Sequence, residues 1–268
     1  MKKIEHLSEI YDSYDSYIID LWGVMHNGIK LNKKAIDTVE NLYKKNKKII
    51  FLSNAPRPSQ NVRNFLRQLK MNEKFLKNIF TSGEAAIKSI KNNQFGKKFF
   101  HLGPQRDACL FEGLEQKKTK INKCDFIICT GLYENFMNDL NYYKDLLKEN
   151  ISKKLICTNP DLIVHRGATK EYCAGKIAEI YKQLGGEVIY FGKPYKEIYE
   201  SVLSKKEKCL AIGDNLNTDI KGANNFNIDS LFITNGVHKN ECKQEKNLKK
   251  ILKNYKVKAQ FFQKELYW

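Results

Sequence analysis

YIIDLWGV, residues 17–24, is a short apolar run that ends in an aspartate, with a glycine three positions later. Apolar runs of about four to eight residues with turn-forming residues behind them are typical of buried β-strands. In open parallel sheets, ligands bind at the carboxyl ends of the strands. Asp20 therefore lies where a catalytic or binding carboxylate is expected.

Strand-like and helix-like segments alternate along the rest of the chain. Seven further apolar runs end in polar or turn-forming residues, at 47–54, 97–103, 125–131, 154–161, 187–194, 208–214 and 230–236. Amphipathic stretches with apolar residues at helical spacing separate most of these runs, as at 33–45, 59–70 and 170–185. The alternation predicts βαβ units, and hence an α/β fold with a doubly wound, Rossmann-like parallel sheet. The basic stretch 243–256 is expected to form a surface helix.

The composition is that of a globular chain with one large domain or two modest ones. Of the 268 residues, 42% are hydrophobic, which is enough for a sizeable core. No apolar run approaches the roughly 20 residues that a membrane span requires, and the N-terminus has no apolar segment of a secretory signal. We therefore expect a cytoplasmic protein with no membrane partner.

Cysteine usage and charge bear on the other classes of function. The seven cysteines form no CxxC pair, so neither a disulfide framework nor a zinc site is indicated. The 47 basic and 30 acidic residues give a net charge of +17. The lysines do not gather into one stripe with interleaved aromatic residues, which makes nucleic acid the poorer of the expected partners. The charge excess favours phosphorylated ligands through long-range steering.

Polar side chains follow four of the predicted strands and offer three carboxylates, one lysine, one hydroxyl and one amide. They are Asp20, Ser53, Asn54, Lys193, Asp214 and Asp219. This set suits phosphoryl transfer, because a carboxylate can attack phosphorus and form an aspartyl-phosphate. A divalent cation is needed between the two anions, and the hard oxygen ligands of Asp20 and Asp214 suit Mg²⁺. Lys193 would neutralise charge on the phosphoryl group, and Ser53 would donate a hydrogen bond to it.

Four motifs, in this order, resemble those of haloacid dehalogenase (HAD) superfamily hydrolases. More narrowly, the chain resembles the class IIA branch, which is NagD-like or nitrophenylphosphatase-like. The motifs are DLWGV (20–24), FLSNAPRPS (51–59), YFGKP (190–194) and GDNLNTDIKGA (213–223). The stretch TSGEAA (81–86) adds to the match with the branch, and the resemblance covers nearly the whole chain.

The resemblance implies a Mg²⁺-dependent phosphatase that acts on a small phosphorylated metabolite. It makes Asp20 the nucleophile, and it gives Ser53 and Lys193 the role of holding the phosphate. The metal ligands that it implies are Asp20, the backbone carbonyl of Trp22, Asp214 and Asp219. Asn54 and Arg57 are expected to orient the substrate. Cap-mediated dimers occur in related proteins, so the resemblance also allows a homodimer.

The family pattern also implies two domains. The HAD-like core would comprise residues 1–83 and 187–268, and an α/β cap domain would be inserted at residues 84–186. Closure of a cap excludes water and supplies substrate contacts. The cap stretch TNPDLIVHRG (158–167) is similar to the family's TNPD segment. Its candidate contacts to the substrate are Asp161, His165 and Arg166.

Trp22 departs from the family pattern. HAD phosphatases usually carry Asp-x-Asp, in which the second carboxylate acts as general acid and base. An indole can only donate a hydrogen bond. One alternative is a phosphatase that uses a good leaving group or a surrogate acid/base, for which His26 is the candidate. A second is chemistry other than phosphomonoester hydrolysis, such as dehalogenation, although that reaction needs no metal. A third is a protein that binds a phosphorylated ligand with weak or no turnover.

Overall fold

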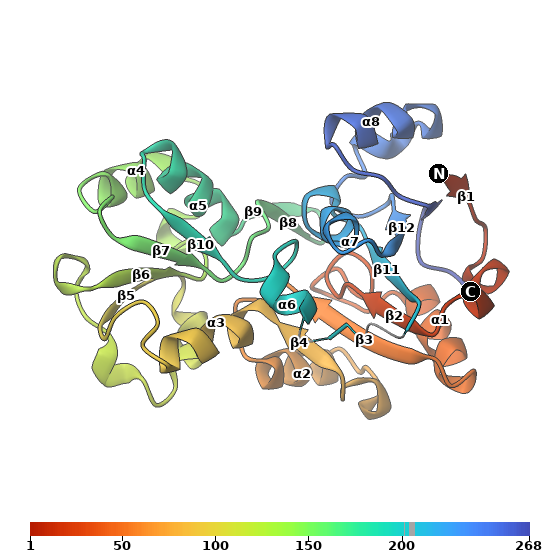
Figure 1. Ribbon diagram of the computed structural model, residues 1–268, viewed down its shortest axis with the longest axis horizontal. Helices are drawn as coiled ribbons and strands as arrows, with labels where there is room; N and C mark the ends of the chain where they lie inside the picture. The colour runs from red at the N-terminus through yellow and green to blue at the C-terminus, as the bar shows by residue number, and fades with distance from the viewer. Residues whose placement is uncertain (201, 204–206) are drawn as a thin grey trace.

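Two parallel β-sheets dominate the computed structural model, which describes residues 1–200, 202–203 and 207–268. In Figure 1 they belong to two α/β bodies that lie side by side, and the body on the right contains both chain termini. The predicted α/β class with a parallel core sheet is confirmed. Among the described residues, no helix is both long and apolar enough to cross a membrane.

The larger sheet has the strand order β1-β13-β12-β11-β2-β3-β4, and every pairing in it is parallel. Its strands in chain order are β1 (Lys2–Lys3), β2 (Ser16–Ile19), β3 (Lys48–Ser53), β4 (Ile79–Thr81), β11 (Cys209–Gly213), β12 (Asp229–Ile233) and β13 (Phe261–Gln263). The helices packed on it are α1 (Lys33–Lys44), α2 (Ser59–Gln68), α6 (Lys196–Glu200), α7 (Lys221–Asn225) and α8 (Leu248–Asn254). We refer to this body as the core.

Both faces of the core sheet are covered by helices, and successive side chains of a strand are buried on opposite faces. Tyr17 and Ile19 of β2 pack with apolar residues of α1 and α2, whereas Ile18 packs with residues of α6 and α7 on the opposite face. A strand that is covered on both sides has no polar face, which is why β2 and its neighbours read as continuous apolar runs. The predicted basic helix is present as α8, although Leu248 and Ile251 are buried.

The smaller sheet has the order β10-β7-β6-β5 and is also parallel. Its strands are β5 (Phe99–Leu102), β6 (Phe126–Cys129), β7 (Lys154–Cys157) and β10 (Val188–Tyr190). Residues of α4 (Leu140–Lys148) and α5 (Ala174–Gln183) cover one face. Residues of α3 (Ser82–Lys91) cover the other. We refer to this body as the cap.

One strand belongs to the cap, although the expected domain boundary places it in the core. Division of the chain at residue 187 assigns the run VIY to the core, but β10 pairs in parallel with β7 of the cap sheet. The run is short and apolar, and such runs carry no information about which sheet they join. Lys193 therefore enters the core site from the end of a cap strand.

A two-stranded antiparallel hairpin extends from the cap toward the core. It consists of β8 (Ile163–Arg166) and β9 (Thr169–Tyr172), which the sequence pattern did not predict as strands. All four residues of β8 are only half-buried. The run therefore lacks the strong apolar signal of the other strands. In Figure 1 the hairpin bridges the gap between the two bodies.

Candidate active site

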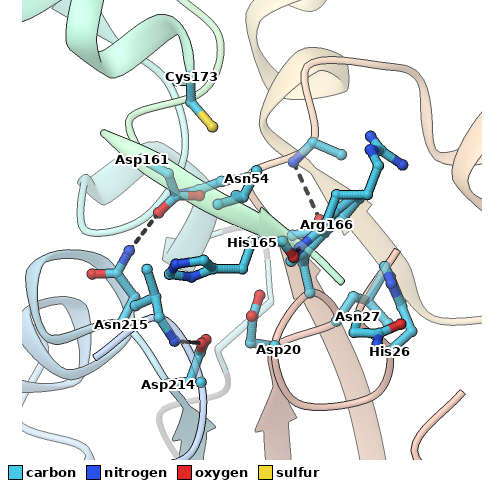
Figure 2. A pocket seen from close by; sticks show the side chains of 18 of the residues that line it. Asp20, His26, Asn27, Asn54, Asp161, His165, Arg166, Cys173, Asp214 and Asn215 are labelled. Carbon is cyan, nitrogen blue, oxygen red and sulfur yellow. Dashed lines mark hydrogen bonds between the residues drawn. The ribbon is translucent and has the colours of Figure 1, made fainter. Parts of the chain in front are cut away.

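One cavity of about 710 Å³ is lined by residues of both the core and the cap. All twelve site residues predicted from the sequence line it: Asp20, Trp22, His26, Ser53, Asn54, Arg57, Asp161, His165, Arg166, Lys193, Asp214 and Asp219. Figure 2 shows many of these side chains converging on one space. The core residues among them lie at or just beyond the carboxyl ends of β2, β3 and β11. They come together because the carboxyl ends of parallel strands share one edge of the sheet.

A buried lysine joins two carboxylates at the floor of the cavity. The Lys193 Nζ atom lies 2.5 Å from Asp20 Oδ1 and 2.7 Å from Asp219 Oδ1. The three side chains are less than a tenth exposed. Charge-assisted hydrogen bonds at such distances are strong, and loss of one partner would leave a buried charge uncompensated. The lysine therefore fixes the position of Asp20.

Asp214 adds a third carboxylate to the floor. Its Oδ2 atom accepts a hydrogen bond of 2.6 Å from the backbone N–H of Val237. Oxygen atoms of Asp20, Asp214 and Asp219 all lie within 4.8 Å of one another. Three carboxylates face one ammonium group there, so the cluster carries an excess of negative charge when it is ionised.

Glycine at position 23 makes room for this cluster. Gly23 has a φ of +97°, and a Cβ atom built there would lie 2.2 Å from Asp214 Oδ2. Glycine adopts positive φ without steric cost and leaves no side chain in the way. The glycine of the YIIDLWGV motif is thus required by the close approach of the Asp214 carboxylate.

Burial and neighbouring charges shift the pKa values of Asp20, Asp214 and Lys193. Burial raises the pKa of Asp20, the Lys193 ammonium opposes this shift, and the nearby Asp219 adds to it. The pKa of Asp214 is raised well above its usual value by burial and by the charges of Asp20 and Asp219. For Lys193, burial lowers the pKa, but the surrounding carboxylates outweigh it and raise the pKa overall. A divalent cation would offset the repulsion between the carboxylates, and its preference for oxygen ligands matches this donor set.

Asn54 holds the backbone on either side of Lys193. Its Oδ1 atom accepts a 2.8 Å bond from the Lys193 N–H, and its Nδ2 atom donates a 3.2 Å bond to the Lys193 carbonyl. The Oγ atom of Ser53 accepts a 3.2 Å bond from the Ala55 N–H, which leaves the hydroxyl proton able to donate into the cavity. Asn54 therefore positions the lysine through its backbone.

The cap carboxylate Asp161 is bonded to the core. Its Oδ1 atom accepts hydrogen bonds from Asn215 Nδ2 at 2.9 Å and from Thr218 Oγ1 at 3.0 Å. Figure 2 shows the bond to Asn215. Burial raises the pKa of Asp161 to about 6. These contacts tie the cap segment before β8 to the start of the π-helical turn Leu216–Ile220.

Two arginines of the site are paired with carboxylates of the cap. Arg57 Nε lies 2.6 Å from Asp107 Oδ1, which joins the core to the cap. Arg166 Nε lies 2.9 Å from Glu171 Oε1 across the β8–β9 hairpin. Asp107 and Glu171 both line the cavity.

Trp22 contacts the hairpin rather than the carboxylate cluster. Its indole Nε1–H donates a 2.9 Å hydrogen bond to the His165 carbonyl, and the Arg166 guanidinium lies 4.9 Å from the indole centroid. His26 packs edge-on against Trp22, with ring centroids 5.1 Å apart. Burial lowers the pKa of His26 to about 4, so its ring is neutral at pH 7. The His26 Nδ1 atom accepts a 3.0 Å bond from the Gly28 N–H.

Sequence reasoning missed four residues that shape the site: Asp107, Glu171, Asn215 and Thr218. Asn215 and Thr218 lie inside the quoted GDNLNTDIKGA motif, where their spacing from Asp214 could have drawn attention to them. Asp107 and Glu171 stand in stretches with no distinctive pattern. Their partners are 50 and 5 residues away in the chain, and only the tertiary structure brings Asp107 to Arg57.

Comparison with known proteins identifies the family. A haloacid dehalogenase-like hydrolase model matches residues 17–117, and a second HAD-like hydrolase model matches residues 190–256. A haloacid dehalogenase-like hydrolase from Brucella suis is 34% identical and superimposes with a TM-score of 0.83, covering 88% of this chain and 90% of its own.

Two curated relatives extend the comparison. Phosphoglycolate phosphatase 1A of Arabidopsis thaliana is 25% identical over 266 residues, which cover 88% of this chain and 73% of that protein. Ribonucleotide monophosphatase NagD of Escherichia coli is 27% identical over 166 residues, which cover 59% of this chain and 63% of that protein. The chain belongs to the haloacid dehalogenase-like hydrolases, in their class IIA, NagD-like branch.

Proposed function

We propose that this hydrolase is a Mg²⁺-dependent phosphatase that cleaves small phosphate esters through an aspartyl-phosphate on Asp20. The observation that carries the proposal is the buried arrangement of Asp20, Lys193 and Asp219, with Asp214 beside them. The phosphatase names of the two curated relatives support the same reaction. A cavity of about 710 Å³ suits a small metabolite.

In the first step, an oxygen of the Asp20 carboxylate attacks phosphorus, and the bond to the leaving oxygen breaks. Lys193 and the Ser53 hydroxyl stabilise negative charge on the phosphoryl oxygens. In the second step, water attacks the same phosphorus, and the electron pair of the P–O bond returns to Asp20. Enclosure of the reacting atoms between core and cap limits competing solvent and strengthens these interactions.

A divalent cation would be held by Asp20, Asp214 and the Trp22 backbone carbonyl, with Asp219 supporting the site. The cation supplies charge neutralisation between the attacking carboxylate and the phosphate. Residues 84–186, together with β10, would act as the cap domain that closes on the core. Closure would then bring Asp161, His165 and Arg166 toward the substrate.

Trp22 affects which leaving groups are accepted. An indole cannot protonate the departing oxygen, so substrates whose leaving group is stable as an anion are expected to react best. His26, the surrogate acid/base suggested by the sequence, is neutral at pH 7 and accepts the Gly28 N–H at Nδ1, so its Nε2 atom carries the proton. In this arrangement the ring can donate a hydrogen bond but has no free lone pair with which to act as a base. His26→Asn is therefore expected to change turnover of a phenyl phosphate little, as measured by phosphate release, and a large loss would show that His26 does take part in proton transfer.

The decisive experiment is phosphate release from a panel of phosphorylated metabolites and aryl phosphates. It would be run with Mg²⁺, with a chelator, and with Asp20→Asn alongside. Turnover that needs both Mg²⁺ and Asp20 supports the phosphatase. Tight binding of one panel member without release of phosphate would instead favour the second candidate, a protein that binds a phosphorylated ligand, for which Trp22 is the specific observation.

Replacement of Asp214 by Asn tests the metal site without an activity assay. In wild-type protein, MgCl₂ is expected to raise the melting temperature, because a ligand that binds the folded state stabilises it. Asp214→Asn is expected to melt at or above wild type without metal, since it removes a buried charge that folding disfavours. The apparent affinity of this variant for Mg²⁺ should be about tenfold lower than that of wild type. Equal Mg²⁺ affinity in the two proteins would exclude Asp214 as a ligand.

A further inference from the structure

The loop after β2 makes three contacts with the β8–β9 hairpin. The Trp22 indole donates to the His165 carbonyl, and Arg166 lies over the indole ring. The Gly167 N–H donates a 3.1 Å bond to the Asn27 carbonyl. All three contacts join the core to the cap, and the residues that make them line the same cavity. Two of them involve Trp22, the residue that stands in place of the family's second aspartate.

The indole ring is held from several sides. A Cβ atom built on Gly28 would lie 2.5 Å from the Trp22 ring, so the loop folds closely around it. The edge of His26 packs against the ring, and Phe65 of α2 packs in turn against His26 with centroids 5.4 Å apart. The indole N–H is thereby aimed at one acceptor, the carbonyl of His165.

The side chain of His165 points into the cavity. In Figure 2 it reaches from the hairpin toward the space bordered by Asp161, Asn215 and Asp214. Its Nδ1 atom is buried and has no hydrogen-bond partner among the residues that the structure describes. No bond joins its Nε2 atom to any residue within 1–200, 202–203 and 207–268. A buried polar atom without a partner is energetically unfavourable, and a bound ligand would supply the missing bond.

We propose that Trp22 is a positioning residue, which holds the His165 backbone so that the imidazole hydrogen-bonds the bound phosphate ester. The inference rests on the proposed function of the same cavity. The indole N–H fixes the carbonyl of His165, and the packed ring of Trp22 supports Arg166 beside it. Trp22 thus occupies the place of the second aspartate, but it contributes by orienting a residue of the cap and not by transferring a proton.

A double-mutant cycle between Trp22 and His165 tests the coupling. Trp22→Phe keeps an aromatic face for Arg166 but removes the indole N–H, and His165→Ala removes the imidazole. Each single variant is expected to lower kcat/KM of the best panel substrate by about tenfold or more, because an oriented hydrogen bond is lost. The double variant should be no worse than His165→Ala, since Trp22 acts through His165. Fully additive losses would overturn the proposal.

The fluorescence of Trp22 gives a readout that does not depend on turnover. The chain has two tryptophans, so the His165 variants would be built on Trp268→Phe, which also serves as a matched substitution outside the cavity. Trp22→Phe removes the reporting indole, so its orthovanadate affinity would be measured by isothermal titration calorimetry. Orthovanadate, a phosphate analogue, is expected to change the Trp22 emission in this background. The affinity for orthovanadate should fall about tenfold in His165→Ala and recover in His165→Asn, which restores a hydrogen-bonding side chain.

The two readouts separate the positioning role from the proposed reaction. Coupled loss of orthovanadate affinity in Trp22→Phe and His165→Ala would support the positioning role even if the panel showed no turnover. Unchanged affinity in both variants would overturn it even if phosphate release were rapid. Trp22→Asp gives a third check, because the indole is lost together with its bond to His165. An orthovanadate affinity of Trp22→Asp equal to that of wild type would contradict a positioning role for the indole.

Discussion

Replacement of Asp20 by Asn is expected to lower kcat by about 10⁴-fold or more while leaving the fold intact. The amide is nearly the same size as the carboxylate, but it is uncharged and a very weak nucleophile. Lys193 retains its 2.7 Å ion pair with Asp219, so the ammonium is not left without a partner. Burial of the Asp20 charge is itself unfavourable, and its removal therefore does not weaken folding.

Asp12→Asn is the matched control for this variant. Asp12 is exposed, and the same substitution there is expected to leave both kcat and the melting temperature at wild-type values. Phosphate release in the presence of Mg²⁺ and thermal denaturation measure the two quantities. A kcat of Asp20→Asn within tenfold of wild type would show that the nucleophile is another group.

Replacement of Lys193 by Met is expected to lower both activity and stability. Lys193 is the only cation bonded to Asp20 and Asp219 within residues 1–200, 202–203 and 207–268. Methionine has a similar length without the charge, so the two carboxylates would be left buried and uncompensated. Loss of one partner from such a cluster costs about 3–5 kcal/mol of folding free energy. Loss of the positive charge on the phosphoryl group would lower kcat/KM by about 10²–10³-fold.

The activity of Lys193→Met should depend on pH differently from that of wild type, and its stability should depend on Mg²⁺. The Lys193 charge lowers the pKa of Asp20, so its removal raises that pKa further. Because a protonated carboxyl cannot attack phosphorus, the residual activity should need a higher pH than wild type. Mg²⁺ should recover part of the lost stability through its own charge.

Lys196→Met is the control, since that side chain is exposed and forms a surface ion pair with Glu200. Its activity and denaturation midpoint should match those of wild type. Equal stability of Lys193→Met and Lys196→Met in chelator would show that the buried cluster does not depend on the lysine. The account of how Asp20 is held would then be wrong.

The core of the site could be predicted because its residues follow strand ends. Asp20, Ser53 and Asp214 each come directly after an apolar run, and parallel strands bring their carboxyl ends together. The eight apolar runs all contain strands, because doubly covered strands are apolar throughout. Local sequence therefore contains most of the information on the floor of the cavity.

The part of the cavity lining that the β8–β9 hairpin and its contacts with the core provide could not be predicted in the same way. Trp22 and His165 are 143 residues apart, and their hydrogen bond uses a backbone carbonyl that no side-chain pattern reveals. The hairpin strands β8 and β9 are half-buried or exposed, so their residues carry no clear alternation. Asn54 was predicted to touch substrate, yet both ends of its amide bond the backbone of Lys193. Such roles depend on tertiary contacts between core and cap.

The most direct test of the central claim is detection of the phosphoenzyme. The protein would be mixed with Mg²⁺ and its best substrate, quenched in acid during turnover, digested and analysed by mass spectrometry. We expect one phosphoryl group on the peptide that carries Asp20, and none on that peptide from Asp20→Asn. Rapid phosphate release with no phosphoryl group on Asp20, or with the group on another residue, would contradict the mechanism.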